Sequence, residues 1–203
     1  PVEDDRGKRT PPSLMTWALI AVSILLTYRG LRHPDFLDRY AYQPDHPLEH
    51  FGLNFIFSTF MHGGKWHLFS NMYFLYIVGD NIEEADGPWT LLLIFMVSAL
   101  TGDLLTSYAN IHTPSIGASG GVAGLLTYYV CMFPRNRMHV GFLMFFRLHI
   151  VSISVAWFLI SWIVVQLIGA FNQLLGFGNI GFLAHLGGAA AGLMFFLLRK
   201  PRN

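Results

Sequence analysis

Long apolar stretches recur along the chain and are separated by short polar segments. A membrane-spanning helix needs roughly 20 mostly apolar residues, and six stretches approach that length. They are Leu14–Tyr28, Trp66–Gly79, Trp89–Tyr108, Ile116–Phe133, Leu148–Ile168 and Ile180–Leu198. The pattern therefore predicts an all-α membrane protein with six transmembrane helices.

Residues 29–65 do not follow this pattern. They contain three prolines and mixed charges, followed by the apolar piece Phe51–Met61, which is too short to span a bilayer. Backbone that lies at membrane depth without spanning must be buried in protein or line a water-filled cavity. We therefore expect a first loop that is partly embedded in the membrane.

The composition agrees with a membrane protein. Of the 203 residues, 53% are hydrophobic and only 12% are charged, whereas about 25% are charged in an average soluble domain. The net charge of +1 gives no reason to expect nucleic acid as a partner. The single cysteine, Cys131, excludes a disulfide framework and a cysteine-based zinc site.

The positions of lysine and arginine predict the orientation, because the cytoplasmic flanks of membrane helices are enriched in both. With a cytoplasmic N-terminus, nine basic residues face the cytoplasm and four face outward. The nine are Arg6, Lys8, Arg9, Arg135, Arg137, Arg147, Arg199, Lys200 and Arg202, and the four are Arg29, Arg32, Arg39 and Lys65. We therefore expect cytoplasmic tails at residues 1–13 and 199–203, with the six-helix domain at residues 14–198.

Several polar residues interrupt the apolar stretches, where an unpaired polar group costs free energy and marks a candidate functional site. The candidates are His62, His67, Asn71, Ser119 and His185. The last four lie in the second, fourth and sixth stretches, which all run from outside to inside, and each lies toward the outer end. Three helices could thus form one water-reachable site in the outer part of the membrane.

The chemistry of these residue types suggests roles. A serine becomes a nucleophile beside a base, and His185 is the intramembrane candidate for a base of Ser119. Asn71 shares a helix face with His67 and has an amide that could donate to a developing oxyanion. Ser119 opens a helix, where free N–H groups and the positive end of the helix dipole lie. A serine bonded to its own backbone, or an Asn71 that ties two helices together, would be the alternative to a catalytic role.

Glycines flank the candidate serine and histidine at intervals of four residues. The pairs are Gly117 with Gly121, Gly120 with Gly124, and Gly188 with Gly192. Small residues at this spacing let membrane helices approach closely. They predict that the fourth and sixth helices pack tightly enough for Ser119 to reach His185, although packing alone would also explain the spacing.

Three motifs built from these residues resemble the rhomboid intramembrane serine proteases. The first is His62-Gly-Gly-Lys-Trp-His67-Leu-Phe-Ser-Asn71, and the second is Gly117-Ala118-Ser119-Gly120 at the start of the fourth helix. The third is Ala184-His185 followed by Gly188-Ala-Ala-Ala-Gly192 in the sixth. The resemblance covers roughly Leu14 to Leu198.

The resemblance implies a rhomboid-like six-helix bundle that is an intramembrane serine endopeptidase, with no cofactor and no metal. Ser119 would be the nucleophile and His185 the general base. The N–H of Ser119 with the side chains of Asn71 and His67 would form the oxyanion hole, and His62 would support the site. The partners would be the lipid bilayer and transmembrane substrates. Because the candidate site lies in the outer part of the membrane, we expect single-span substrates that are cut near their outer end. The location would be a bacterial inner membrane.

Two positions depart from the family pattern. Many rhomboids have Trp-Arg in the first loop, where this chain has Leu53 and Asn54. Many also have Tyr or Phe four residues after the serine, packed against the catalytic histidine, where this chain has Ala123. We therefore expect the loop to be anchored differently and His185 to be supported from elsewhere.

Three other functions fit parts of the pattern. A catalytically inactive rhomboid-like protein that binds membrane clients would typically lack the serine or the histidine, and both are present. A zinc-dependent protease could use His62 and His67, but the spacing differs from His-Glu-x-x-His. A transporter could use Asp103 as a proton site, but no inverted repeat is visible. The fifth helix and the loop Gly169–Gly178 are candidate gates for substrate, on glycine content alone.

Overall fold

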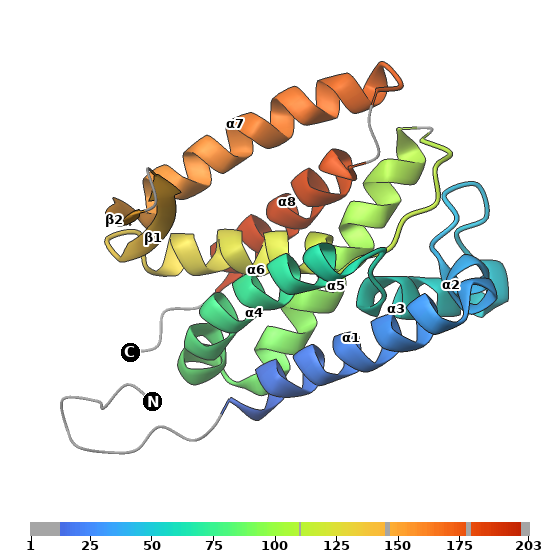
Figure 1. Ribbon diagram of the computed structural model, residues 1–203, viewed down its shortest axis with the longest axis horizontal. Coiled ribbons are helices and arrows are strands. Elements are labelled where there is room, and N and C mark those ends of the chain that lie inside the picture. Colours follow the sequence, from blue (N-terminus) through green and yellow to red (C-terminus); the bar gives the residue numbers. More distant parts are fainter. Residues whose placement is uncertain (1–12, 110, 145–146, 178–179, 200–203) are drawn as a thin grey trace.

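The computed structural model describes residues 13–109, 111–144, 147–177 and 180–199, and it is mostly helical (Figure 1). The helices are α1 (Leu14–Arg32), α2 (Pro34–Tyr40), α3 (Leu53–Phe60), α4 (Lys65–Asp86), α5 (Pro88–Tyr108), α6 (Ser119–Met132), α7 (Val155–Leu174) and α8 (Phe182–Leu198). A short 3-10 turn, η1 (Glu49–Gly52), precedes α3. Apart from Ser13 and Arg199, the predicted tails lie outside the described residues.

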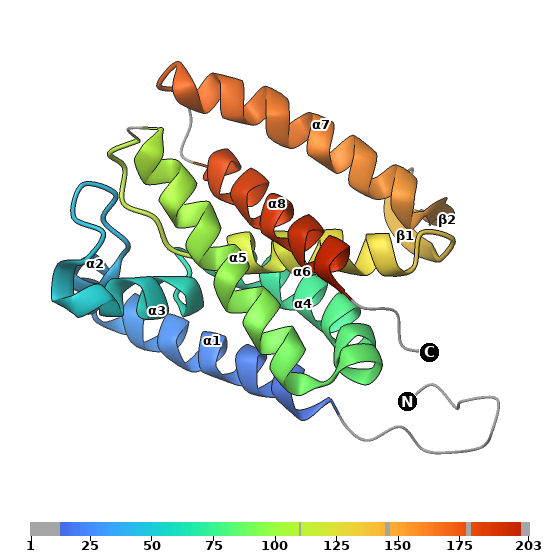
Figure 2. The same ribbon diagram turned by 180° about the vertical axis from the view of Figure 1, so that it is seen from behind.

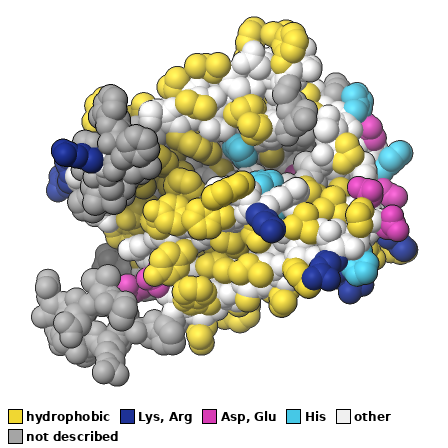
Figure 3. All heavy atoms as spheres, viewed as in Figure 1, with side chains coloured by type: hydrophobic (Ala, Val, Ile, Leu, Met, Phe, Trp, Pro, Cys, Tyr) yellow, Lys and Arg dark blue, Asp and Glu magenta, His cyan; other side chains and the backbone are white. Residues whose placement is uncertain are grey.

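Three of these helices, α1, α5 and α7, are long and apolar enough to cross a membrane, and α6 and α8 are shorter apolar helices. The face drawn in Figure 3 is largely hydrophobic across its middle, where a dark-blue basic patch interrupts it, and most other charged side chains lie toward its ends. A hydrophobic belt between charged ends is the surface that a bilayer requires. Five of the six apolar stretches of the sequence thus correspond to apolar helices of the structure.

The centre of the molecule is formed by α5, α6 and α8, which pack directly on one another (Figures 1 and 2). On α8, a Cβ at Gly188 would collide with the carbonyl oxygen of Gly120, and one at Gly192 with that of Gly124. The backbones of α6 and α8 are thus in direct contact over one helical turn. This close approach brings the start of α6 next to the start of α8.

Helix α4 is longer than the apolar stretch predicts, since it continues beyond Gly79 to Asp86. Two of its acidic side chains, Asp80 and Glu83, bond to the start of α1. The carboxylate of Glu83 accepts hydrogen bonds from the N–H groups of Met15 and Thr16 at 2.9 and 2.8 Å, and Ser13 donates to Asp80. Because the first N–H groups of a helix have no partner within it, Glu83 serves as the cap that α1 lacks.

Asp86 ties the last turn of α4 to two other helices. Arg199, just after α8, contacts it through Nε at 3.1 Å and Nη2 at 3.0 Å, and the hydroxyl of Tyr128 in α6 donates to it at 2.8 Å. The hydrogen bonds with Asp86 raise the pKa of Arg199. The start of α1 and the end of α8 therefore lie at the same end of the bundle.

The prediction of an all-α chain is wrong between α6 and α7. Strands β1 (Arg137–Met144) and β2 (Arg147–Ser154) form an antiparallel hairpin in which Arg137 pairs with Ser154. The fifth helix begins at Val155 rather than Leu148 and ends at Leu174 rather than Ile168. Residues 147–154 include the β-branched Ile150, Val151 and Ile153, which favour a strand, and a short apolar run does not distinguish strand from helix by its pattern.

The first loop folds into α2, η1 and α3 instead of spanning. Asn54, one of the residues that departs from the family pattern, is fully buried there. Its amide donates to the carbonyl oxygen of Ala41 at 3.0 Å, and its oxygen contacts Nδ1 of His50 at 3.0 Å. An amide thus joins α3 to η1 and to the segment after α2, where many rhomboids have Trp-Arg.

Candidate active site

The chain just before Ser119 is held by the first loop. Tyr42 and Ser115 exchange two backbone hydrogen bonds of 3.0 Å, and the N–H of Gly117 donates to the carbonyl oxygen of Ser58 at 2.9 Å. Burial raises the pKa of Tyr42, so its hydroxyl stays neutral and shares a 2.7 Å hydrogen bond with Ser107. These contacts fix the path of the chain into the first residue of α6, which is Ser119.

His62 holds the same turn through a hydrogen bond to Ala118. Its Nε2 accepts a hydrogen bond from the N–H of Ala118 at 3.3 Å, so the ring proton lies on Nδ1. Nδ1 then donates to the hydroxyl of Thr27 at 3.1 Å, and that hydroxyl donates to the carbonyl oxygen of Phe60 at 3.3 Å. Both nitrogens of His62 are therefore occupied by the protein.

This occupancy argues against the zinc alternative. His62 is fully buried and has no lone pair left for a metal. Within the part of the chain that the structure describes, no group of three or more His, Cys, Asp and Glu side chains could hold a metal ion. His62 is instead placed to support the turn that carries Ser119.

Gly117 makes the turn possible and brings His67 close to it. Its φ of 135° lies in a region that side chains other than glycine rarely adopt. A Cβ at this position would lie 2.8 Å from Cε1 and 2.9 Å from Nε2 of His67. The imidazole of His67 therefore lies directly against the turn, and its ring also meets that of His62 at 5.0 Å, nearly edge to face.

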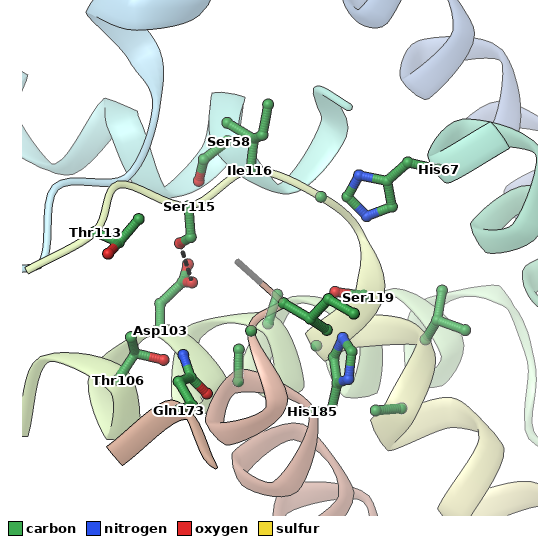
Figure 4. Close-up of a pocket in the computed structure, with 18 of the residues that line it drawn as sticks. Ser58, His67, Asp103, Thr106, Thr113, Ser115, Ile116, Ser119, Gln173 and His185 are labelled. Atoms are coloured by element: carbon green, nitrogen blue, oxygen red, sulfur yellow. Dashed lines mark hydrogen bonds between the residues drawn. The ribbon is translucent and has the colours of Figure 1, made fainter. Parts of the chain in front are cut away.

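Ser119, His185, His67 and Asn71 line one cavity of about 820 Å³. Figure 4 shows Ser119 and His185 side by side and His67 facing the same space. The Ser119 hydroxyl makes no hydrogen bond with any other described residue. One amide hydrogen of Asn71 is donated to the carbonyl oxygen of His67 in its own helix, at 2.9 Å. The structure thus brings together the side chains that the sequence placed in three different helices.

Asp103 lines the same cavity, farther from Ser119. It accepts a hydrogen bond of 3.3 Å from the hydroxyl of Ser115, drawn as the dashed line in Figure 4. It thus lies beside the segment that leads into the Ser119 turn.

His185 is held mainly by α7. Its Nδ1 lies 2.8 Å from Oε1 of Gln166, and its ring lies 6.0 Å from that of Trp162, with 31° between the planes. The ring of Phe182, in its own helix, lies 6.3 Å away. Gln166 and Trp162 were not among the residues selected from the sequence. The available signal was a glutamine inside a largely apolar helix.

The comparison with known proteins agrees with this geometry. Residues 51–202 match the model of the Rhomboid domain. The chain belongs to the rhomboid family. The resemblance found in the sequence is thereby confirmed, and the chain is a multi-pass membrane protein of the rhomboid type.

Several rhomboid proteins are similar to this chain. It is 31% identical to Rhomboid-like protease 5 of Toxoplasma gondii over 140 residues, which cover 69% of this chain and 15% of that protein. It is 26% identical to the mitochondrial Rhomboid protein 1 of Saccharomyces cerevisiae over 207 residues, which cover 92% of this chain and 54% of that protein. It is 29% identical to the mitochondrial RHOMBOID-like protein 12 of Arabidopsis thaliana over 166 residues, which cover 72% of this chain and 46% of that protein.

These relatives bear on two further points. The chain spans between 15% and 54% of the length of the three rhomboid proteins. All three are eukaryotic and two are mitochondrial, so they give no support to the predicted location in a bacterial inner membrane.

Proposed function

We propose that this rhomboid is an intramembrane serine endopeptidase that cleaves membrane proteins through a Ser119–His185 dyad. The observation that supports this most is that the unpaired hydroxyl of Ser119 and the imidazole of His185 line one cavity. His67 and Asn71 line it as well, as donors for an oxyanion. A nucleophile, a base and a set of donors are the groups that acyl transfer requires.

The first half of the reaction forms an acyl-enzyme. Nε2 of His185 takes the proton of Ser119 as Oγ bonds to the carbonyl carbon of the scissile peptide. The negative charge moves to the carbonyl oxygen, where the N–H of Ser119 and the side chains of His67 and Asn71 donate to it. The C–N bond then breaks, and His185 gives its proton to the leaving amine.

The second half uses water from the outer side of the membrane. His185 takes a proton from the water as its oxygen attacks the acyl carbon, and the same donors hold the oxyanion. The bond to Ser119 Oγ then breaks, and the proton returns from His185 to Oγ. The enzyme is regenerated with a new carboxyl end on the substrate.

In this proposal α1, α4, α5, α6, α7 and α8 are six spans, with both termini in the cytoplasm. The meeting of the start of α1 with the end of α8 at one end of the bundle supports an even number of spans. The cavity then lies in the outer part of the membrane. Substrates are single-span proteins whose helix unwinds near its outer end, since a helical backbone hides its peptide groups in hydrogen bonds.

Labelling with a fluorophosphonate probe tests the proposal. The protein in detergent is expected to label, and the Ser119→Ala and His185→Ala variants are expected not to label, because the probe reacts only with an activated serine. Ser161→Ala is the matched control, since Ser161 is an exposed serine of α7 that bonds to its own helix. A folded protein that stays unlabelled, beside a serine protease that labels, would favour the inactive client-binding function.

Gly117→Ala is expected to lower the rate of substrate cleavage by about 100-fold or more. The added methyl group meets the His67 ring and strains a backbone with φ of 135°, and displacing a reacting group by about 1 Å costs about 10² in rate. Gly87→Ala is the control, because Gly87 also has a positive φ but has no atoms within 4 Å of an added Cβ. Equal activity of the two variants would contradict the assigned role of the turn.

A further inference from the structure

Helix α7 contacts the rest of the protein through one narrow face. Half of its residues are exposed, and among its buried residues are Gln166, Gly169, Ala170 and Gln173. Their spacing of three, four and seven residues places them on one side of the helix. A Cβ at Gly169 would collide with the ring of Phe182, so this face lies directly on α8.

The two glutamines of this face are polar groups in an apolar surrounding, where each needs a hydrogen-bond partner. Both find it on α8. Oε1 of Gln173 accepts from the N–H of Leu183 at 3.0 Å, and Oε1 of Gln166 faces Nδ1 of His185 at 2.8 Å. Of these two bonds between α7 and α8, only that of Gln166 reaches the base of the proposed dyad.

The orientation of the Gln166 amide fixes the direction of its bond. Its NH₂ group donates to the carbonyl oxygen of Trp162, one turn earlier, at 3.2 Å. The oxygen must therefore face His185, and since it can only accept, Nδ1 of His185 must carry the ring proton. Nε2 is then unprotonated and free to take the proton of Ser119.

We propose that Gln166 is the positioning residue of the dyad, which holds His185 in the tautomer and rotation that a general base needs. The inference rests on the proposed function. In the serine triad a carboxylate orients the base, whereas here a neutral amide on α7 does so, with the ring of Trp162 against the imidazole. Seating of α7 on α8 is therefore a condition for an active dyad.

Removal of the acceptor tests the positioning role. Gln166→Leu keeps the bulk of the side chain but leaves Nδ1 without a partner, so the imidazole can adopt the other tautomer and rotate. We expect kcat for a single-span substrate in proteoliposomes to fall about 10- to 100-fold, part of the 10²–10⁴ that general-base catalysis contributes. KM is expected to change less than about twofold, because Gln166 touches His185 rather than substrate.

A charged acceptor gives a signature that packing does not. Gln166→Glu keeps the size and an acceptor oxygen, and its carboxylate stabilises the imidazolium of His185. The acid limb of the kcat/KM profile is then expected to move to higher pH by about one unit or more. The other titratable groups facing this cavity, His67 on α4, Asp103 on α5 and His112 after α5, are the same in both proteins, so the shift reports the new carboxylate.

Gln173→Leu is the matched control, because it removes the other hydrogen bond from the same face of α7. It is expected to lower the melting temperature about as much as Gln166→Leu and to leave the pH profile unchanged. If Gln166→Leu and Gln173→Leu have the same kcat and Gln166→Glu has the wild-type profile, Gln166 acts only by packing and the inference is overturned. A wild-type protein that neither cleaves nor labels would instead overturn the proposed function.

Discussion

Replacing Ser119 and His185 together with alanine is expected to slow substrate cleavage no more than replacing either one alone. Each single variant is expected to lower kcat by about 10⁴-fold or more, because a serine without a base and a base without a serine both lose the acyl-enzyme route. Effects that share one chemical step do not add. Full additivity of the two substitutions would mean that the residues act in separate steps.

This result is measured with one single-span substrate in proteoliposomes, with the cut site mapped by mass spectrometry. The proposal places the cut near the outer end of the substrate span. A cut mapped near the cytoplasmic end would contradict the assigned depth of the cavity, even if the kinetics agreed. Ser161→Ala again serves as a serine that can be lost without effect.

Gly188→Leu is expected to prevent formation of the native bundle. Even the Cβ would collide with the carbonyl oxygen of Gly120, so α8 would have to move away from α6 along its whole contact. Overpacking of this kind costs about 3 kcal/mol, which is a large share of the stability of an ordinary domain. In size-exclusion chromatography the variant is expected to give no monodisperse peak, and it is expected to have no activity.

Ala190→Leu is the control for this prediction. Ala190 is also in α8, two residues away, but it is exposed, so the larger side chain faces lipid or detergent. Its melting temperature is expected to stay close to the wild-type value. A Gly188→Leu protein as stable as Ala190→Leu would show that the backbones of α6 and α8 are not in direct contact at Gly188.

Much of this arrangement could be predicted from the sequence. The apolar stretches place four of the six main helices (α1, α5, α6 and α8) within a few residues, because apolar length is a strong signal. The boundary of α4 could not be predicted, since Asp80, Glu83 and Asp86 look like a polar loop until the ends of α1 and α8 provide partners. The hairpin was missed because residues 147–154 are apolar enough to pass for the start of a span.

The candidate site likewise contains residues that the sequence predicts and residues that it does not. Ser119, His67 and His185 stand in motifs of fixed spacing, and the structure places all three around one cavity. Gln166 stands in no motif, because its partner is 19 residues away on another helix. Ala123 lines the same cavity as His185, and it is α7 that contacts the imidazole, through Gln166 and Trp162. That contact depends on how helices far apart in the sequence meet.

The turn that carries Ser119 has a consequence for how the protein can be divided. The match to the Rhomboid domain begins at residue 51, yet His62 bonds to Thr27 and the strand-like pair at Ser115 is completed by Tyr42. A chain shortened to the matched region would keep Ser119 and His185 but would lose two of the supports of the nucleophile. The smallest part of this protein that keeps these supports therefore includes α1, which lies well before the start of the Rhomboid-domain match at residue 51.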